Sequence, residues 1–450
     1  MTHSVPPQSP SPPHAEDRQA LAALRARGYR VHDIQGLARD QRPFAVRVEA
    51  RERALAPGVR IQEESVELGG GAFANVHTLR IARSAARVDV ESDPIGFALR
   101  DRCGADAVAA VSGSFSFISD EPDHRPAEPC LDFCSRRGET VSLPTVAKPA
   151  FLVHRGRPSL RTLPAAGTLV LGSAVRAWIG SKETAAPDHV RRGALAVFGA
   201  ANCTVRYADD AVTGFTRFVE RTGNVTPRDP GVVDAVVERV APHLHVIRSV
   251  HPGGGADLFS GSYVLRGAAA HARPLTVGTE VRVTGIAGLA AEHLECGISI
   301  GPSAADAASG DVAAYDASLG TSPFRPVRYA RTLLWLEGRT MCFRVIDGAP
   351  LTDSFRGMTP AEVVRDLERS GVDPRTAHHL DGGQSSKIAF RCEGDTEVVA
   401  NLHYLQWPGA GEHTFRWRGI EGRALHSAFV VRTRAEPPSG GRRGGRACDG

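Results

Sequence analysis

The segment Ala377–Phe390, AHHLDGGQSSKIAF, constrains the fold of this chain more than any other feature of the sequence. Apolar residues on both sides of its centre indicate buried strand, whereas the pair Gly382 and Gly383 is incompatible with an ordinary strand interior. Glycine pairs permit positive φ angles and let backbone N–H groups converge on an anion. The pattern predicts a carboxylate, Asp381, beside an amide-lined hollow at a strand end. A tight hairpin turn is the structural alternative, since Asp-Gly is a strong hairpin signal.

The stretch before this turn carries a complete set of helix signals. Thr359 is placed to cap a helix, Pro360 suits its first position, and Glu362 can close a capping box. An apolar stripe follows, and Gly371 is placed to end the helix. The sequence therefore predicts, in order, a helix, a short apolar strand and the turn that carries Asp381.

This helix and turn resemble the signature of the phosphodiester glycosidase family, in which a G-x-T…E helix precedes a strand ending in N-L-D-G-G-G-S-S. The resemblance extends from Val59 to Arg432. It implies a hydrolase that cleaves the glycosidic C–O bond of a sugar-1-phosphodiester and releases a sugar and a phosphomonoester. Four more segments resemble, in order, the family patterns A-V-N-G-G-F-F, G-P-x-L, R-T-A-I-G and V-V-D-G-R: Ala110–Phe115, Gly301–Ser303, Arg331-Thr332 and Val345–Gly348.

Four positions depart from the family pattern. Ser112 replaces an Asn, Ser114 replaces a Gly, Gln384 replaces the third Gly of the loop, and His379 replaces an Asn or a small residue. Because of these departures, an alternative is that the chain has lost catalysis and only binds a carbohydrate or a nucleotide sugar. A phosphodiesterase that cleaves the P–O bond is another alternative.

The predicted chemistry centres on one carboxylate. Asp381 is the principal candidate, as base, nucleophile or charge stabiliser, and the resemblance places Asp347 near it as a second. A phosphomonoester is a weakly basic leaving group, so the reaction needs no strong general acid. Arg331 is the predicted phosphate clamp, because a guanidinium can bind two phosphate oxygens at once. The other predicted substrate-binding residues are Thr332, Ser112, Gly113, Phe115, Gly382, Gly383, Gln384, Ser385, Ser386 and His379.

Several of these residues also have structural interpretations. Asp347 could belong to a plain turn, and Arg331 could be a strand arginine that reaches solvent. His379 could be a packed core histidine. Ser112 and Phe115 could belong to a plain turn and to the core.

Composition narrows the partners of the chain. Lys plus Arg number 54 and Asp plus Glu number 50, and no contiguous basic and aromatic stretch suggests nucleic-acid binding, so we expect no nucleic-acid partner. The polar N-terminus resembles no secretory signal, and no apolar run is long enough to span a membrane. The sequence therefore predicts a cytoplasmic enzyme, with the Arg-rich composition of a bacterial protein, acting on a sugar-phosphodiester. It makes no prediction of oligomeric state.

The cysteines give no sign of a disulfide framework, since the 8 in the sequence are irregularly spaced. Cys130 and Cys134 are the only close pair. Their spacing, without a second pair, favours free thiols over a zinc site. The sequence accordingly predicts neither a metal nor a cofactor.

Alternating apolar and polar residues from Val59 onward predict half-buried strands. The predicted fold class is α+β, with a large, mixed, strand-rich sheet or barrel-like core and a few flanking helices. One of these helices is expected within Gly231–His251, where valines recur on one face, and a short one at Asp17–Arg27. Three parts are predicted: a Pro-rich disordered tail and leader (1–57), a glycosidase-like domain (58–435) with insertions at about 120–145 and 180–290, and a disordered Gly/Arg tail (436–450).

Overall fold

The computed structural model describes residues 30–32, 47–104, 106–116, 128–209, 216–312, 324, 326–348, 357–400, 404–406, 414–417 and 424–434. The predicted helix Asp17–Arg27 and the predicted tail 436–450 lie outside these residues. Strands dominate the fold, and helices are few, so the predicted α+β class is roughly right but the protein is mostly β. None of the helices in the described ranges is long and apolar enough to cross a membrane.

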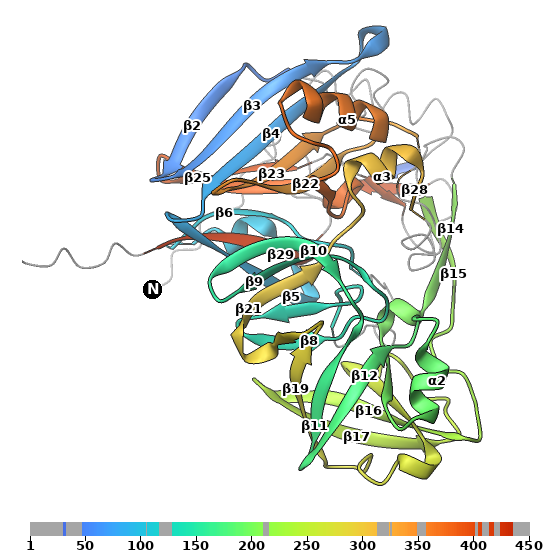
Figure 1. Ribbon diagram of the computed structural model, residues 1–450. Helices are drawn as coiled ribbons and strands as arrows, with labels where there is room; N and C mark the ends of the chain where they lie inside the picture. Colours follow the sequence, from blue (N-terminus) through green and yellow to red (C-terminus); the bar gives the residue numbers. More distant parts are fainter. Residues whose placement is uncertain are drawn as a thin grey trace, which may run out of the picture.

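Two antiparallel sheets form the upper half of the molecule in Figure 1. The six-stranded sheet has the order β2 (Arg51–Ala56), β3 (Val59–Glu67), β4 (Phe73–Ala82), β23 (Thr340–Asp347), β22 (Arg331–Glu337) and β24 (His378–His379). The five-stranded sheet has the order β26 (Asp395–Ala400), β25 (Lys387–Cys392), β6 (Ala107–Ser112), β29 (Leu425–Thr433) and β5 (Ala86–Phe97). β2 lies within the segment predicted as a leader.

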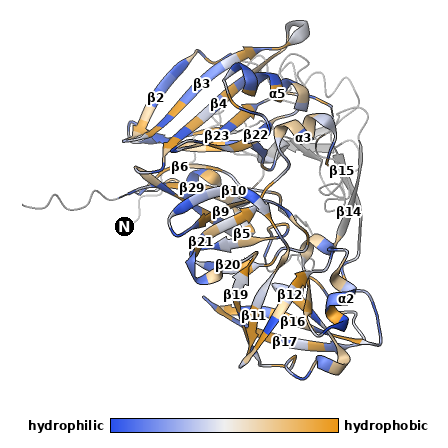
Figure 2. Ribbon diagram, viewed as in Figure 1, coloured by the Kyte–Doolittle hydropathy of each residue, from blue (hydrophilic) through white to orange (hydrophobic). Residues whose placement is uncertain are grey.

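The main hydrophobic core is shared by these two sheets and the third sheet described below. Successive side chains of a strand point to opposite faces, so every second residue can be apolar and buried. In β3 this places Val59 and Ile61 in the core, and Phe343 and Phe429 meet them from β23 and β29. Figure 2 shows hydrophobic and hydrophilic residues alternating along β3 and β4.

The helices α5 (Pro360–Arg369) and α3 (Ala304–Ser309) lie beside the six-stranded sheet (Figure 1). The predicted capping box of α5 is confirmed: Glu362 N donates to Thr359 Oγ1 at 3.1 Å, and Thr359 N donates to Glu362 Oε2 at 2.9 Å. Val363 and Leu367 belong to a core cluster with outer-face residues of the sheet. Gly371 follows the helix with φ 73°, as predicted. This packing fixes the strand that leads to Asp381.

A further five-stranded sheet completes the middle of the molecule. Its order is β10 (Arg157–Leu163), β9 (Lys148–His154), β21 (Leu294–Ser299), β7 (Cys134–Arg136) and β8 (Glu139–Ser142). Smaller pieces pair elsewhere: β1 (Arg30–His32) with β28 (Thr414–Trp417), β28 with β27 (Tyr404–Gln406), and β14 (Thr204–Asp209) with β15 (Thr216–Thr222).

The lower part of the molecule in Figure 1 is a closed barrel of 7 strands. Pairing of β11 with β19 closes it, and the short helix α2 (Ala186–Arg191) packs against β13 and β18. The barrel strands, in order, are β11 (Ala166–Leu171), β12 (Ala174–Gly180), β13 (Leu195–Phe198), β18 (Tyr263–Ala268), β16 (Val232–Ala241), β17 (Leu244–Pro252) and β19 (Glu280–Ile286), with β20 (Leu289–Ala290) added to β19.

The helix predicted within Gly231–His251 is wrong, because this segment forms the hairpin β16–β17 of the barrel. Its valines are β-branched, which lowers helix propensity and suits a pleated sheet. His243 adopts a positive φ of 58° and turns the chain between the two strands. The spacing of the valines is compatible with both a helix and a strand, so residue type was the more informative signal.

Candidate functional site

Asp381 follows β24 and is held against the start of β22 by backbone hydrogen bonds on both sides. Leu380 N donates to Thr332 O at 2.9 Å, and Gly383 N donates to Ala330 O at 2.8 Å. The short pairing of β24 with β22 thus continues into the loop. Asp381 itself is half-buried, and these bonds fix its backbone against the sheet.

The predicted amide cradle is wrong, because the N–H groups of this loop are used within the fold. Gly382 N donates to Asp381 Oδ1 at 2.9 Å, and Gly383 N donates to the neighbouring strand. Ser385 N donates to Gly382 O and Ser386 N to Gly383 O, both at 3.1 Å, which closes a 3-10 turn over Gly383–Ser385. The N–H groups of these four residues are therefore not directed at an anion.

Gly383 lets another side chain pack closely against the loop, and it does not form an open anion-binding nest. Its φ is 60°, a region that side chains with a Cβ avoid. A Cβ at this position would also overlap the ring of Tyr329. The glycine thus lets Tyr329 pack directly on the loop. Gln384 lies in the same 3-10 turn, and its side chain lies outside the described part of the structure.

The Asp381 side chain lines a small hollow between the end of β6, the loop and the start of β29. The hollow has a volume of about 10 Å³, room for about one water molecule or one oxygen atom of a substrate. Among the described residues, Asp381 is the one acidic residue that lines it. The other lining residues are Gly113, Ser114, Ser116, Ser385, Ala424, Leu425, His426 and Ser427.

Gly113 forms a wall of this hollow, where two distant segments meet. Asp381 N donates to Gly113 O at 3.2 Å, and Gly113 N donates to Ser427 O at 2.9 Å. A Cβ at Gly113 would overlap Ser427. Glycine is therefore required for the β6 loop to lie against both the Asp381 loop and β29.

Ser112 and Thr332 lie behind the hollow rather than in it. Both are fully buried, and Ser112 Oγ lies 3.2 Å from Thr332 Oγ1, a contact that joins the two large sheets. Lys387 N donates to Ser112 Oγ at 3.4 Å. The Lys387 side chain is only 1% exposed, and this buried cation next to the loop was missed by the sequence analysis.

Arg331 is a buried positioning residue in this structure. Its Nε donates to Met358 O at 2.7 Å and its Nη2 to Val327 O at 3.1 Å. Desolvation lowers the pKa of its guanidinium to about 10, although Tyr329 and Glu362 act in the opposite direction. The side chain is 3% exposed and does not line the hollow. These contacts support the backbone before α5, and they make Arg331 a poor direct phosphate clamp.

His379 is a packed histidine, the structural alternative considered for it. It is 1% exposed, and its ring lies 5.3 Å from that of Phe324, which makes an edge contact with Phe115. Burial lowers the pKa of His379 well below its usual value, and Arg331 and His378 act in the same direction. The imidazole is therefore neutral at pH 7 and does not reach the hollow. Phe115 likewise belongs to this aromatic cluster.

Asp347 lies at the end of β23, on the far side of β22 from Asp381. Its partner in the sheet is Asn75 of β4, and its Oδ1 accepts a hydrogen bond from Gly348 N at 2.8 Å. It does not line the hollow. Of the predicted site residues, the structure thus brings Asp381, Gly113 and Ser385 into one hollow.

His426 and Ser427 are site residues that the sequence analysis missed. Both come from β29, and both line the hollow with Asp381. The Nδ1 atom of His426 lies 3.0 Å from the carbonyl oxygen of Asp93, so in the neutral ring Nδ1 carries the proton and Nε2 carries the lone pair. Ser427 Oγ donates to Ser114 O at 3.0 Å. Neither residue lies in a recognisable motif.

Comparisons with known proteins give matches in structure alone: no family model matches the chain, and no characterised protein matches it by sequence. A hypothetical protein from Synechocystis superposes with a TM-score of 0.50 at 14% identity, covering 86% of this chain and 64% of that one. The chain thus spans less than two thirds of the Synechocystis protein. At this level of identity the likeness shows a shared fold.

Two further solved structures are similar at lower scores. A putative exported protein from Burkholderia pseudomallei has a TM-score of 0.45 at 16% identity, covering 80% of this chain and 74% of that one. The catalytic domain of zebrafish N-acetylglucosamine-1-phosphodiester alpha-N-acetylglucosaminidase, auto-inhibited by its pro-peptide, has a TM-score of 0.37 at 11% identity, covering 86% and 88%. Both similarities are too distant to assign an activity, which has to be argued from the residues around Asp381.

Proposed function

We propose that this chain is a hydrolase that cleaves the glycosidic C–O bond of a sugar-1-phosphodiester, releasing the sugar and a phosphomonoester. The observation that carries the proposal is the position of Asp381. It occupies the Asp of the loop that resembles the phosphodiester glycosidase signature, and it is the one carboxylate that lines the hollow among the described residues.

A single carboxylate suits this reaction. Cleavage of the C–O bond builds positive charge on the anomeric carbon, which an adjacent carboxylate stabilises or attacks. The bonding electrons leave with the phosphate, which is a weak base and needs little protonation. The neutral, packed His379 is consistent with a reaction that does without a strong general acid.

Recognition of the phosphate falls to side chains in the hollow. The hydroxyl groups of Ser114, Ser116 and Ser385 line it together with the His426 imidazole. Serine hydroxyls and an imidazole N–H can donate hydrogen bonds to phosphoryl oxygens, and the hydroxyls can both donate to and accept from sugar hydroxyl groups. The hollow admits about one oxygen atom. We infer that one phosphoryl or hydroxyl oxygen enters it while the rest of the substrate lies outside it.

A second candidate is a non-catalytic module that binds a carbohydrate or a nucleotide sugar. Two observations favour it: the volume of the hollow is small, and the Arg331 guanidinium is engaged with backbone carbonyls. A module of this kind would bind sugar phosphates without turnover. A P–O-cleaving phosphodiesterase remains a further alternative to be distinguished by the position of bond cleavage.

The test is hydrolysis of a panel of UDP-sugars and sugar-1-phosphodiesters in ¹⁸O-labelled water. We expect the label in the released sugar, and Asp381→Asn should lower kcat by about 10²–10⁴-fold. Asp373→Asn is the matched control, since Asp373 is exposed and lies in the turn after α5. Label in the phosphate would overturn C–O cleavage. Binding without turnover in both the wild type and Asp381→Asn would establish the module instead.

A further inference from the structure

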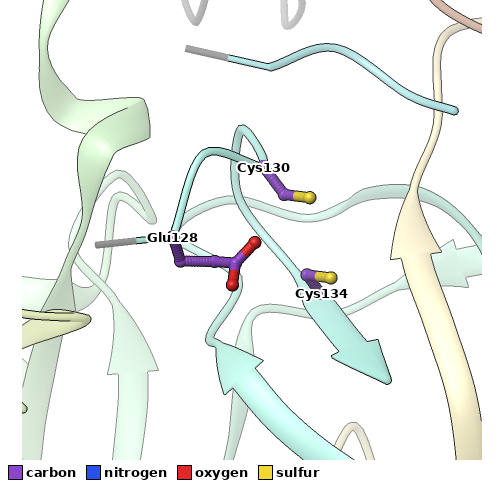
Figure 3. Close-up of side chains that lie close together, drawn as sticks. All are labelled: Glu128, Cys130 and Cys134. Atoms are coloured by element: carbon purple, nitrogen blue, oxygen red, sulfur yellow. The ribbon is translucent and has the colours of Figure 1, made fainter. Parts of the chain in front are cut away.

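Two cysteines and a glutamate meet at a buried point just before β7. Figure 3 shows the side chains of Glu128, Cys130 and Cys134 converging on one small space. Their ligand atoms all lie within 4.8 Å of one another. The three residues are 4%, 2% and 0% exposed, in that order. None of them lines the hollow that contains Asp381.

The buried Glu128 carboxylate is only partly paired, by an ion pair with Arg136 and by contacts with Ser92 and Cys130. Its Oε2 lies 3.6 Å from Arg136 Nη2, beyond hydrogen-bond distance, and its Oε1 has no hydrogen-bond partner among the described residues. An anionic carboxylate buried with incomplete pairing is costly, and a cation at this point would offset that cost.

The spacing of the three groups fits a tetrahedral metal centre. Zn–S bonds of about 2.3 Å and Zn–O bonds of about 2.0–2.2 Å place neighbouring ligand atoms about 3.5–3.8 Å apart. The observed separations of up to 4.8 Å need a contraction of at most about 1.3 Å. Rotation about the side-chain bonds of Glu128 can supply part of this movement. Cys130 and Cys134 lie near the two ends of a short loop, and their side chains point in the same direction (Figure 3).

The charges also balance. Two thiolates and the Glu128 carboxylate carry three negative charges, and a divalent cation together with Arg136 carries three positive ones. A divalent metal therefore leaves the buried cluster neutral, which lowers the cost of burying it. Soft thiolates with one carboxylate favour Zn²⁺ over Mg²⁺ or Ca²⁺, which prefer oxygen ligands.

We propose that this chain binds one Zn²⁺ ion through Cys130 Sγ, Cys134 Sγ and a carboxylate oxygen of Glu128. Each thiol releases its proton to solvent as its metal–sulfur bond forms. The hydroxyl of Ser92, 3.9 Å from Cys134 Sγ, or a water molecule completes the tetrahedron. The sequence favoured free thiols because Cys130 and Cys134 have no second close pair, and Glu128, two residues before Cys130, was not considered as a ligand.

The zinc centre stabilises the segment that supports the candidate active site. Cys130 forms an isolated β-bridge with Ser116, and Leu131 N donates to Phe115 O at 3.0 Å. Ser116 lines the hollow with Asp381. A metal bound to Cys130 would therefore hold Ser116, and with it one side of the hollow, in place. The role that we assign to the metal is structural.

A disulfide between the two cysteines is the competing explanation. It would use both sulfur atoms and leave the Glu128 carboxylate with no new partner. Glu128 therefore distinguishes the two explanations. Replacing its carboxylate should weaken metal binding at a metal centre, whereas it should not affect a disulfide between the cysteines. Thiol state and metal content are measured independently of any enzymatic activity.

The experiment measures metal in the full chain, purified without chelator, by elemental analysis, and titrates apo protein with Co²⁺. We expect about one zinc ion per chain and a thiolate-to-cobalt charge-transfer absorption typical of tetrahedral sulfur ligation. The double variant Cys130→Ser/Cys134→Ser should lose both signals. Glu128→Gln should weaken metal affinity about 10-fold or more. Cys342→Ser, an equally buried cysteine outside the cluster, is the control and should retain both.

Three results would overturn the proposal. The first is a wild-type chain that holds no zinc and gives no cobalt spectrum. The second is a mass lower by two hydrogen atoms, which reports a Cys130–Cys134 disulfide. The third is unchanged affinity in Glu128→Gln. If the double cysteine variant fails to fold, the wild-type spectrum and the Glu128→Gln titration still decide the question.

Discussion

Ser112 Oγ lies 3.2 Å from Thr332 Oγ1, and this contact between two buried hydroxyls joins the end of β6 to the start of β22. The first strand leads into the Gly113 wall of the hollow, and the second receives the hydrogen bonds of the Asp381 loop. The geometry of the candidate active site therefore depends on a contact between two sheets, located behind the residues that meet a substrate.

This contact should be measurable as a coupling energy. Ser112→Ala and Thr332→Val should each lower the free energy of unfolding by about 1–3 kcal/mol, because each leaves a buried polar partner unsatisfied. The double variant should lose less than the sum of the two. Denaturant unfolding of all four chains gives the cycle, and Ser309→Ala, at an exposed position, should change stability by less than about 0.5 kcal/mol. Strict additivity would show that the two hydroxyls do not interact.

The packing of Tyr329 on Gly383 predicts a difference between two glycines. Gly371 and Gly383 have φ angles of 73° and 60°, but only Gly383 has neighbouring atoms where a Cβ would lie. Gly371→Ala should lower stability by about 1–2 kcal/mol through backbone strain alone. Gly383→Ala should cost a further 1–3 kcal/mol or so, because Tyr329 must move. Thermal and denaturant unfolding would compare them, and equal losses would argue against the close approach of Tyr329.

The burial of His379 predicts a loss of stability in mild acid. Its pKa is well below the usual value in the native state, so below about pH 6.5 the unfolded chain takes up a proton that the native chain refuses. Stability should therefore fall as the pH drops from 6.5 toward 5, with a limiting slope of about 1.4 kcal/mol per pH unit from this group.

The variant His379→Gln removes this titration. Its urea midpoint should depend less on pH between 7 and 5 than that of the wild type, although His378, whose pKa burial also lowers, preserves part of the effect. His271→Gln, at an exposed position, is the control and should follow the wild-type curve. An unchanged slope in His379→Gln would contradict a neutral, buried His379.

His426 should contribute to turnover if the hollow binds the phosphate. The contact of its Nδ1 with Asp93 O orients the ring, and glutamine can replace the hydrogen bond but cannot titrate. His426→Gln should lower kcat/KM by about 10²-fold and flatten the acid limb of the pH profile. His251→Gln in the barrel strand β17 is the control. Full activity in His426→Gln would remove the imidazole from the mechanism.

Local signals predicted the region around Asp381 well. Thr359, Pro360 and Glu362 act within one turn of α5, and their capping interactions depend on the adjacent chain only. Where residues close together in the chain determine the local structure, that structure can be predicted from the sequence alone.

The remainder depends on residues far apart in the chain. The N–H groups of the Asp381 loop are satisfied partly by Ala330 O, a partner that no local pattern reveals, and so the predicted amide cradle did not form. His426 enters the hollow from a strand near the end of the described chain. Each of these is a tertiary effect, invisible to spacing and propensity.

The pairing of β11 with β19 gives the lower part of the molecule a continuous hydrogen-bonded circumference. Unpaired strand edges are the sites at which β-rich proteins recruit other chains and aggregate. The hairpin β16–β17 is one part of that closed ring of strands. It is rich in valine, so its strands would pair readily with other chains if their edges were exposed. Substitutions that open the seam between Gly167 and Ile286 should therefore affect self-association and solubility before they affect any chemistry at Asp381.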